Sequence, residues 1–194
     1  MRRIVILFLI LGIAVSGCTS TRKVERIDET ETIDLSGRWN DTDSRLVAEE
    51  MISDALSRDW KDNFLEKQGQ KPSVVVGLVR NKSHEHINTE TFIKDIEREF
   101  INSGMVRVVQ AGSAREQLRE ERGQQQEFAS PETVKSWGRE IGADFMLQGV
   151  LNSIVDSIDK KKVVFYQVDL ELSDIETGEK VWIGSKKIKK FIKN

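Results

Sequence analysis

Hydrophobic residues between about positions 42 and 66 recur every four residues. The two series are Val47–Met51–Ala55 and Ile52–Leu56–Trp60–Phe64. Positions four apart lie on the same side of an α-helix, so the two series form one apolar stripe. We predict a helix over about 42–66, with Asp41 or Thr42 accepting the free amide hydrogens of its first turn.

The next segments alternate between continuous apolar runs and runs with helical spacing. Residues 72–81, PSVVVGLVRN, are an apolar run typical of a buried strand. Asn88 or Thr89 can cap a second helix, which Gly104 ends. The buried side of that helix is expected to be Phe92, Ile96 and Phe100. Residues 105–110, MVRVVQ, are then predicted to be a strand.

Two further helices are expected before the pattern changes. Ser113 and Glu116 have the spacing of a capping box and precede the polar run AREQLREERGQQQEF. Because this run has few apolar residues, we expect an exposed helix. Ser130 followed by Pro131 starts another helix, since proline is favoured at the first helical position. The buried side of this last helix is predicted to be Val134, Trp137 and Ile141.

The C-terminal third has a period of two. Residues 163–172, VVFYQVDLEL, alternate apolar and polar positions, as in a strand with one buried face. ADFMLQGVLNSIVDSI before it and VWIGSKKIKKF after it complete a predicted antiparallel meander. We therefore expect an α/β fold in one compact domain, residues 35–194, with a mixed sheet of about five strands and about four helices.

The N-terminus has the layout of an export signal. Arg2 and Arg3 precede twelve apolar residues, Ile4 to Val15, a run too short to span a bilayer comfortably. Small residues then lead into Cys18, the only cysteine, so no intramolecular disulfide can form. This order resembles the lipobox of bacterial lipoproteins. It predicts a signal peptide at 1–17 and a lipidated Cys18 that starts a short flexible tether, residues 18–34.

The charge of the chain argues against nucleic acid as a partner, and one basic segment has two possible roles. Removing residues 1–17 takes away Arg2 and Arg3 and moves the formal charge from −2 to −4. Without a basic excess, nucleic-acid binding is not expected. The segment SKKIKKFIKN is locally basic. Its lysines can protect a sheet edge from pairing, or they can contact an acidic partner or an anionic lipid surface.

No catalytic constellation is recognisable. Glycine-rich phosphate loops, dinucleotide fingerprints and serine-hydrolase signatures are absent. His84 and His86 flank Glu85, but a zinc site needs further ligands, and none has a recognisable spacing. We therefore expect an exposed loop there, no metal site, no cofactor and no enzymatic activity.

The stretch DLSGRWNDTDSRLVAEEM, Asp34–Met51, places a tryptophan between an arginine and an asparagine just before the first helix. Gly37 would permit a turn that other residues disfavour. Two interpretations stand: the loop clamps the first helix onto the sheet, or it contacts a partner, since Trp and Arg are favoured at binding hot spots. The candidate residues are Arg38, Trp39, Asn40, Asp43 and Arg45.

This stretch after a lipobox and a polar tether resembles the LpoB family of penicillin-binding-protein activators. Two further segments continue the resemblance: PSVVVGLVRNKSHEHINTETFIKDIEREFINSGMVRVV and IGADFMLQGVLNSIVD. The resemblance implies a fold similar to the TolB N-terminal domain and an outer-membrane lipoprotein facing the periplasm. It also implies a noncatalytic docking domain of a class A penicillin-binding protein as partner, which the lipoprotein stimulates allosterically in peptidoglycan synthesis.

One departure from the family concerns the tether. The best-known members have a long, proline-rich tether, whereas this chain has about 16 tether residues and no proline among them. Such a segment reaches at most about 55 Å. Either the synthase reaches outward or the partner differs.

Three other expectations concern the location, the function and the oligomeric state of the protein. Thr19, rather than Asp, follows Cys18, which by the enterobacterial sorting rule favours the outer membrane. The competing function is a structural or assembly lipoprotein related to the curli secretion lipoprotein. The soluble part is expected to fold as a monomer.

Overall fold

The computed structural model describes residues 23–28, 30–128 and 141–193. Two units are distinct, Met1–Glu31 and Thr32–Asn194. In the first unit, the described residues form neither helix nor strand, and the Thr30 amide and hydroxyl donate to Asp28. The second unit contains the sheet, the described helices and the core.

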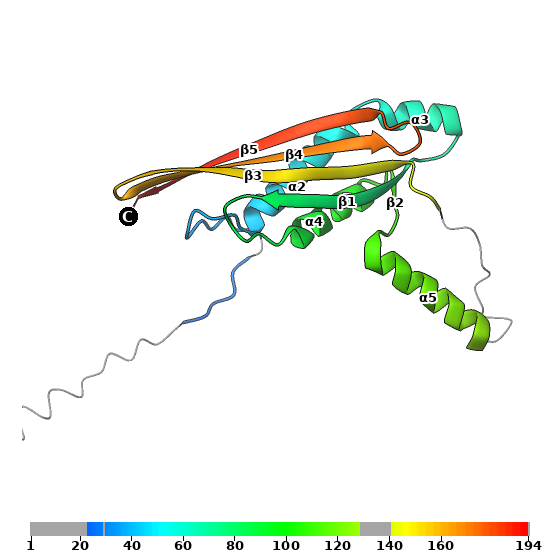
Figure 1. Cartoon of the computed structure of the whole chain (residues 1–194), viewed down its shortest axis with the longest axis horizontal. Helices are drawn as coiled ribbons and strands as arrows, with labels where there is room; N and C mark the ends of the chain where they lie inside the picture. Colours follow the sequence, from blue (N-terminus) through cyan, green and yellow to red (C-terminus); the bar gives the residue numbers. More distant parts are fainter. Residues whose placement is uncertain (1–22, 29, 129–140, 194) are drawn as a thin grey trace, which may run out of the picture. The chain divides into compact units, whose positions relative to one another are not determined.

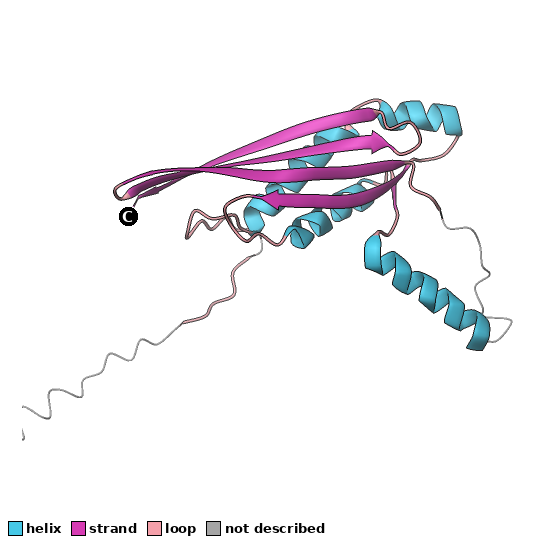
Figure 2. Ribbon diagram, viewed as in Figure 1, coloured by secondary structure: helices cyan, strands magenta, loops and turns pink. Residues whose placement is uncertain are grey.

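A five-stranded mixed sheet organises the second unit, with strands in the order β2-β1-β3-β4-β5 (Figure 2). The strands are β1 Ser73–Lys82, β2 Arg107–Val108, β3 Phe145–Ile158, β4 Lys161–Asp174 and β5 Lys180–Lys193. β1 runs parallel to β2 and β3, and β3, β4 and β5 form an antiparallel meander. The described helices are α2 Asp41–Leu56, α3 Trp60–Gln68, α4 Thr89–Ser103 and α5 Gly112–Phe128. The predicted α/β class, mixed sheet and meander are confirmed.

One face of the sheet is buried under α2 and α4 (Figure 1). The alternation on β4 shows why: its even-numbered residues from Val164 to Leu172 are buried, and the odd-numbered ones between them are only partly so. Phe92, Ile96 and Phe100 on α4 are fully buried, as the spacing predicted. The helices therefore cover the even-numbered face of β4.

The antiparallel strands are longer than the helices that cover them. Fourteen residues of antiparallel strand extend about 48 Å, at about 3.4 Å per residue. The sixteen residues of α2 rise about 24 Å, at about 1.5 Å each. One end of β3, β4 and β5 therefore continues past the helices as a three-stranded ribbon, which tapers to the β3–β4 turn beside the C-terminus (Figure 1).

The first predicted helix is wrong in two respects: it is interrupted, and its N-cap is a different residue. It is two helices, α2 and α3, separated at residues 57–59. The Trp60 indole N–H donates over 2.7 Å to the Ala55 carbonyl, which also accepts the Arg58 amide hydrogen at the end of α2. The N-cap of α2 is Asn40, which precedes the predicted Asp41 by one residue and the predicted Thr42 by two.

Two other predictions differ from the structure, and a third falls outside the described residues. The strand expected over 105–110 is reduced to β2, because only Arg107 and Val108 pair in register with β1. The helix expected after Ser130 lies outside the described residues. Ile141, predicted to be buried, is 56% exposed in the segment that leads into β3.

β5 is an edge strand, as its lysines suggested, but those lysines have two different environments. Successive side chains of a strand point to opposite faces. Lys186 and Lys190 point toward the helices and pair with acidic groups, Lys186 with Glu50 and Lys190 with Asp34 and Asp43. Lys187 and Lys189 point to the other face and are exposed.

Candidate functional site

The loop before α2 is held by a reciprocal pair of hydrogen bonds. The Asn40 side-chain oxygen accepts from the Asp43 amide, and the Asp43 carboxylate accepts from the Asn40 amide, each over 3.0 Å. The Asn40 side-chain amide also donates to the Ile33 carbonyl and the Asp34 carboxylate. This capping box fixes the direction in which the chain enters α2.

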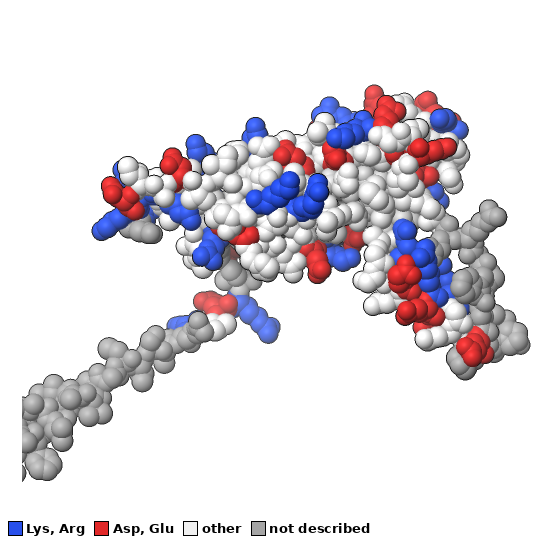
Figure 3. Space-filling view, viewed as in Figure 1, with Lys and Arg blue, Asp and Glu red and all other residues white. Residues whose placement is uncertain are grey.

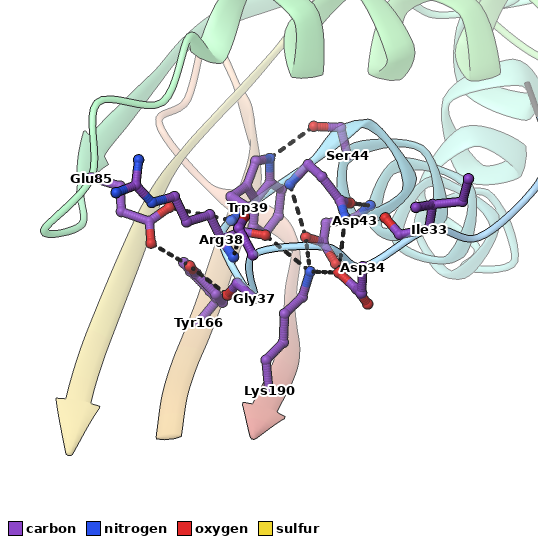
Figure 4. A network of polar contacts seen from close by, with 12 residues as sticks. Ile33, Asp34, Gly37, Arg38, Trp39, Asp43, Ser44, Glu85, Tyr166 and Lys190 are labelled. Atoms are coloured by element: carbon purple, nitrogen blue, oxygen red, sulfur yellow. Dashed lines mark hydrogen bonds and ion pairs between the residues drawn. The ribbon is translucent and has the colours of Figure 1, made fainter. Parts of the chain in front are cut away.

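Lys190 on β5 ties this loop to the sheet (Figure 4). Its ammonium donates to Asp34 over 2.5 Å, to Asp43 over 2.6 Å and to the Arg38 carbonyl over 3.1 Å. Burial alone would lower the pKa of Lys190, but its two carboxylate partners outweigh burial and raise that pKa. Burial raises the pKa of Asp43, and the bond from Lys190 only partly offsets it. Lys190 therefore stays charged over the whole physiological range.

Trp39 packs into the domain rather than standing in solvent. Its ring meets Phe92 of α4 and Tyr166 of β4 edge-to-face, with centroids 6.1 and 5.7 Å apart. The indole N–H donates to Ser44 over 2.9 Å, and the Trp39 backbone amide donates to the Glu85 carboxylate over 3.2 Å. The ring thus joins the loop, α2, α4 and the sheet.

Glu85 is a second anchor that the sequence did not reveal. The segment His84–His86 was expected to be an exposed loop, yet the Glu85 side chain is only 12% exposed. It accepts from the Tyr166 hydroxyl over 2.7 Å, and burial with this carboxylate partner raises the pKa of Tyr166. His84 stacks on Tyr166 and contacts the Ser153 hydroxyl through Nδ1 over 2.6 Å. Both histidines remain at the rim, and Glu85 reaches inward.

Gly37 has the positive φ that the sequence analysis suggested, at +67°. A Cβ built on it would lie 2.5 Å from two carbons of Ile192 on β5. The loop therefore approaches the ribbon more closely than any residue with a side chain would allow.

We expect Gly37→Ala to lower the free energy of unfolding by about 1–3 kcal/mol, because alanine is strained at this φ and must displace Ile192. Urea denaturation followed by circular dichroism measures the loss. Gly69→Ala is the matched control, since Gly69 has the same φ of +67° but open space around it. A loss no larger than in the control would show that crowding against Ile192 contributes nothing.

A hollow of about 590 Å³ lies between this loop and the His84–Asn88 segment. Arg38 and Asp41 line it on one side, His84 and His86 on another, and Lys162 comes from β4. Arg38 is exposed, and its charged group is not used in the hydrogen bonds that hold the loop. The hollow therefore combines a hydrogen-bonded floor, Trp39 and Glu85, with charged and polar side chains at its rim.

The structure brings some of the predicted site residues together and separates one of them. Trp39, Asn40 and Asp43 belong to one hydrogen-bonded network, and Arg38 borders it through its carbonyl. Arg45 instead pairs with Glu49 one turn along α2, over 3.1 Å, and does not line the hollow. Cys18 lies outside the described residues.

The described part of the chain offers a hollow lined by polar and charged side chains. No group of three or more His, Cys, Asp or Glu residues there is placed to hold a metal ion. In the same residues, no helix has the length and apolar character needed to cross a membrane. Acidic and basic side chains are interspersed over the face seen in Figure 3. The described part is thus an α/β domain with a polar hollow beside the loop before α2.

Comparison with known proteins places this domain in a family. A sequence model described as "Peptidoglycan-synthase activator LpoB" matches residues 43–188, most of the second unit. The chain belongs to the LpoB family of peptidoglycan-synthase activators. Activators of this family are non-catalytic. A search of curated proteins finds no match.

Solved structures that are similar to this chain include LpoB proteins. The NMR structure of E. coli LpoB is 14% identical, with 93% of this chain and 87% of that chain covered and a TM-score of 0.44. The LpoB C-terminal domain from Salmonella enterica is 16% identical, covering 66% and 90%, with a TM-score of 0.37. Lipoprotein GNA1162 from Neisseria meningitidis is 16% identical, covering 62% and 83%, with a TM-score of 0.40. The family assignment rests on the sequence model.

Proposed function

We propose that this protein is a lipoprotein of the outer membrane, anchored through Cys18, that binds and stimulates a class A penicillin-binding protein from the periplasmic side. The family match over residues 43–188 carries this proposal. The order of signal, cysteine and polar tether in residues 1–34 supports the anchor. The partner site would be a noncatalytic docking domain of the synthase, so the lipoprotein would act allosterically.

The hollow beside Arg38 is the surface we propose for this contact. Its floor is fixed by the Trp39, Glu85 and Lys190 network, so little conformational freedom is lost when a partner binds there. Arg38 is exposed at the rim, and arginine is enriched at binding hot spots. Asn40 and Asp43 would then act by holding the loop in shape, and Arg45 would not be a direct contact.

The decisive experiment mixes the purified lipoprotein in detergent with the class A synthase of the same organism and follows lipid II consumption. We expect the synthase rate to rise, with a coupling of about 1–3 kcal/mol, because an activator must bind the active state more tightly than the inactive one. The lipoprotein alone should consume no lipid II.

Arg38→Glu should weaken this stimulation without unfolding the domain, because its side chain is exposed. Arg98→Glu is the matched control: Arg98 is also an exposed arginine, on α4, and does not line the hollow. Unchanged stimulation by the Arg38→Glu variant would show that the synthase contacts another surface of the domain. No binding and no rate change with folded wild-type protein would reject the activator proposal and favour a structural or assembly lipoprotein.

Mass spectrometry of the native protein tests the anchor separately. We expect a diacylglyceryl or triacyl adduct on Cys18 as the new N-terminus, because small residues precede it directly after the apolar run. Cys18→Ala should leave the protein unprocessed and without the adduct. An unmodified Cys18 in the wild-type protein would contradict the anchor and leave the fold untouched.

A further inference from the structure

The ribbon end of the sheet exposes large apolar side chains on the face away from the helices. Ile154 is 65% exposed, Ile158 71% and Phe191 63%. In the register of the meander, three exposed lysines share this face and this end of the strands. We define the ribbon patch as these six residues: Ile154, Ile158, Phe191, Lys161, Lys189 and Lys193.

The lysines of the ribbon patch differ from their neighbours in what they contact. Lys190, one residue from Lys189, is buried and bonded to two carboxylates. The patch lysines make no ion pair within the described residues, and Lys161 lies directly opposite Lys193. Like charges directly opposite one another on a sheet are destabilising, so this pair is relieved when an anion binds between or above them.

Protection of a sheet edge explains only part of this arrangement. Lysines alone would discourage pairing by another strand. Edge protection gives no reason to expose Ile154, Ile158 and Phe191 beside those lysines. Asp156 on β3 and Asp159 in the turn reduce the positive charge of this end, but three patch lysines and the adjacent Lys160 exceed them. The surface is therefore both cationic and apolar.

The N-terminal segment joins the domain at this same end. Asp34 is bonded to Lys190, and Gly37 lies against Ile192, both near the ribbon end of β5. A lipid on Cys18 would hold Asp34 within about 55 Å of the bilayer, the fully extended length of 16 residues. The part of the domain nearest to the anchor along the chain is thus the end that carries the ribbon patch.

We propose that the ribbon patch docks on the anionic surface of the bilayer in which the protein is anchored. Lysines reach phosphate headgroups while aromatic and aliphatic side chains enter the interface, as in other peripheral membrane contacts. An acidic protein would match the lysines, but the exposed isoleucines and phenylalanine beside the anchored end match a lipid surface better. This inference rests on the proposed lipid anchor and not on stimulation of a synthase.

Docking in this way leaves the hollow accessible. Lys161 belongs to the ribbon patch, and the next residue, Lys162, lines the hollow. Consecutive strand residues point to opposite faces, so the two surfaces lie on opposite sides of the ribbon. Because the tether raises the local concentration of the patch at the bilayer, even a weak contact would be populated.

A fluorescence experiment on the whole lipoprotein tests the proposal. Lipidated protein carrying Phe191→Cys is labelled with an environment-sensitive NBD dye and reconstituted into vesicles, either neutral or containing phosphatidylglycerol. We expect a blue shift and quenching by lipid-borne spin labels only in the anionic vesicles, reversed at high salt, where the Debye length falls to about 3 Å. The dye on Ile101→Cys, an exposed residue of α4, should respond to neither.

Charge variants separate this contact from a general effect of lysines. Replacing Lys161, Lys189 and Lys193 by glutamine should lower the docked-to-undocked ratio about a hundredfold, at about fivefold per lysine near the surface. The matched control replaces three exposed lysines elsewhere, Lys67, Lys71 and Lys94. Equal emission in neutral and anionic vesicles, or equal loss in both triple variants, would overturn the proposal. The assay contains no synthase, so its result is independent of the activator function.

Discussion

Lys190→Met is expected to lower the free energy of unfolding by about 3–5 kcal/mol, the loss seen when one partner of a buried ion pair is removed. Methionine fills a similar volume, so the loss comes from charge and not from a cavity. Asp43 is left as a buried carboxylate without its cation, and the Arg38 carbonyl loses a donor. Asp34 is affected less, because its side chain is 48% exposed. Urea denaturation followed by tryptophan fluorescence measures the change.

Two companion variants identify the cause. Lys189→Met, one residue away and exposed, should change the free energy of unfolding by less than about 0.5 kcal/mol. Adding Asp43→Asn to Lys190→Met should recover part of the loss, because the amide removes the buried charge and can still accept from the Asn40 amide. If the double variant is no more stable than Lys190→Met, the unpaired Asp43 charge is not the source of the loss.

The same ion pair predicts that the free energy of unfolding falls in the alkaline pH range. The folded-state pKa of Lys190 is raised above its ordinary value, so the folded protein binds this proton more tightly than the unfolded chain. The resulting stability is fully present below the ordinary lysine pKa of about 10.4 and is lost as the pH rises through the raised value. Lys190→Met should lack this contribution to the alkaline loss.

Trp39→Ala is the second substitution expected to have a large effect, at about 3 kcal/mol of unfolding free energy, the low end for buried tryptophan because the ring is only half-buried. The variant removes edge-to-face contacts with Phe92 and Tyr166 and the bond to Ser44. Each aromatic pair adds about 0.5–1.5 kcal/mol beyond its buried area. Thermal and urea unfolding should both show the loss.

Trp39→Phe separates ring packing from hydrogen bonding. It keeps most of the apolar contact but leaves Ser44 without its donor, so about 1 kcal/mol should be lost. The clamp and partner-contact interpretations also give different outcomes. A Trp39→Ala protein that is as stable as the wild type but no longer binds the synthase would mean that the ring is a partner contact and does not clamp the loop.

The fold was predictable where the pattern of side chains is local. Alternation on β4 and the four-residue spacing of Phe92, Ile96 and Phe100 report directly which face is buried, because each period belongs to one kind of element. The break after Leu56 was not predictable in this way. The apolar stripe continues through Trp60, so the spacing alone did not show that α2 ends at Leu56 and that Trp60 begins α3.

The site was predictable only in part, because its contacts join residues far apart in the sequence. The glycine and tryptophan of the loop are visible as a pattern, but Glu85 lies between two histidines and meets Tyr166 across 81 residues. The run KKIKK contains buried Lys190 and half-buried Lys186 beside two exposed lysines. Strand parity could have separated Lys190 from Lys189, but only once the register with β4 was known.

The contact between Asp34 and Lys190 also constrains the order in which the domain can form. These residues are 156 positions apart, and β1 pairs in parallel with β3 across a connection of about sixty residues. The antiparallel meander is made of near neighbours and can form early, whereas contacts across long separations form late because closing long loops costs entropy. During synthesis, α2 and its preceding loop must therefore wait, incompletely packed, until β5 has been made.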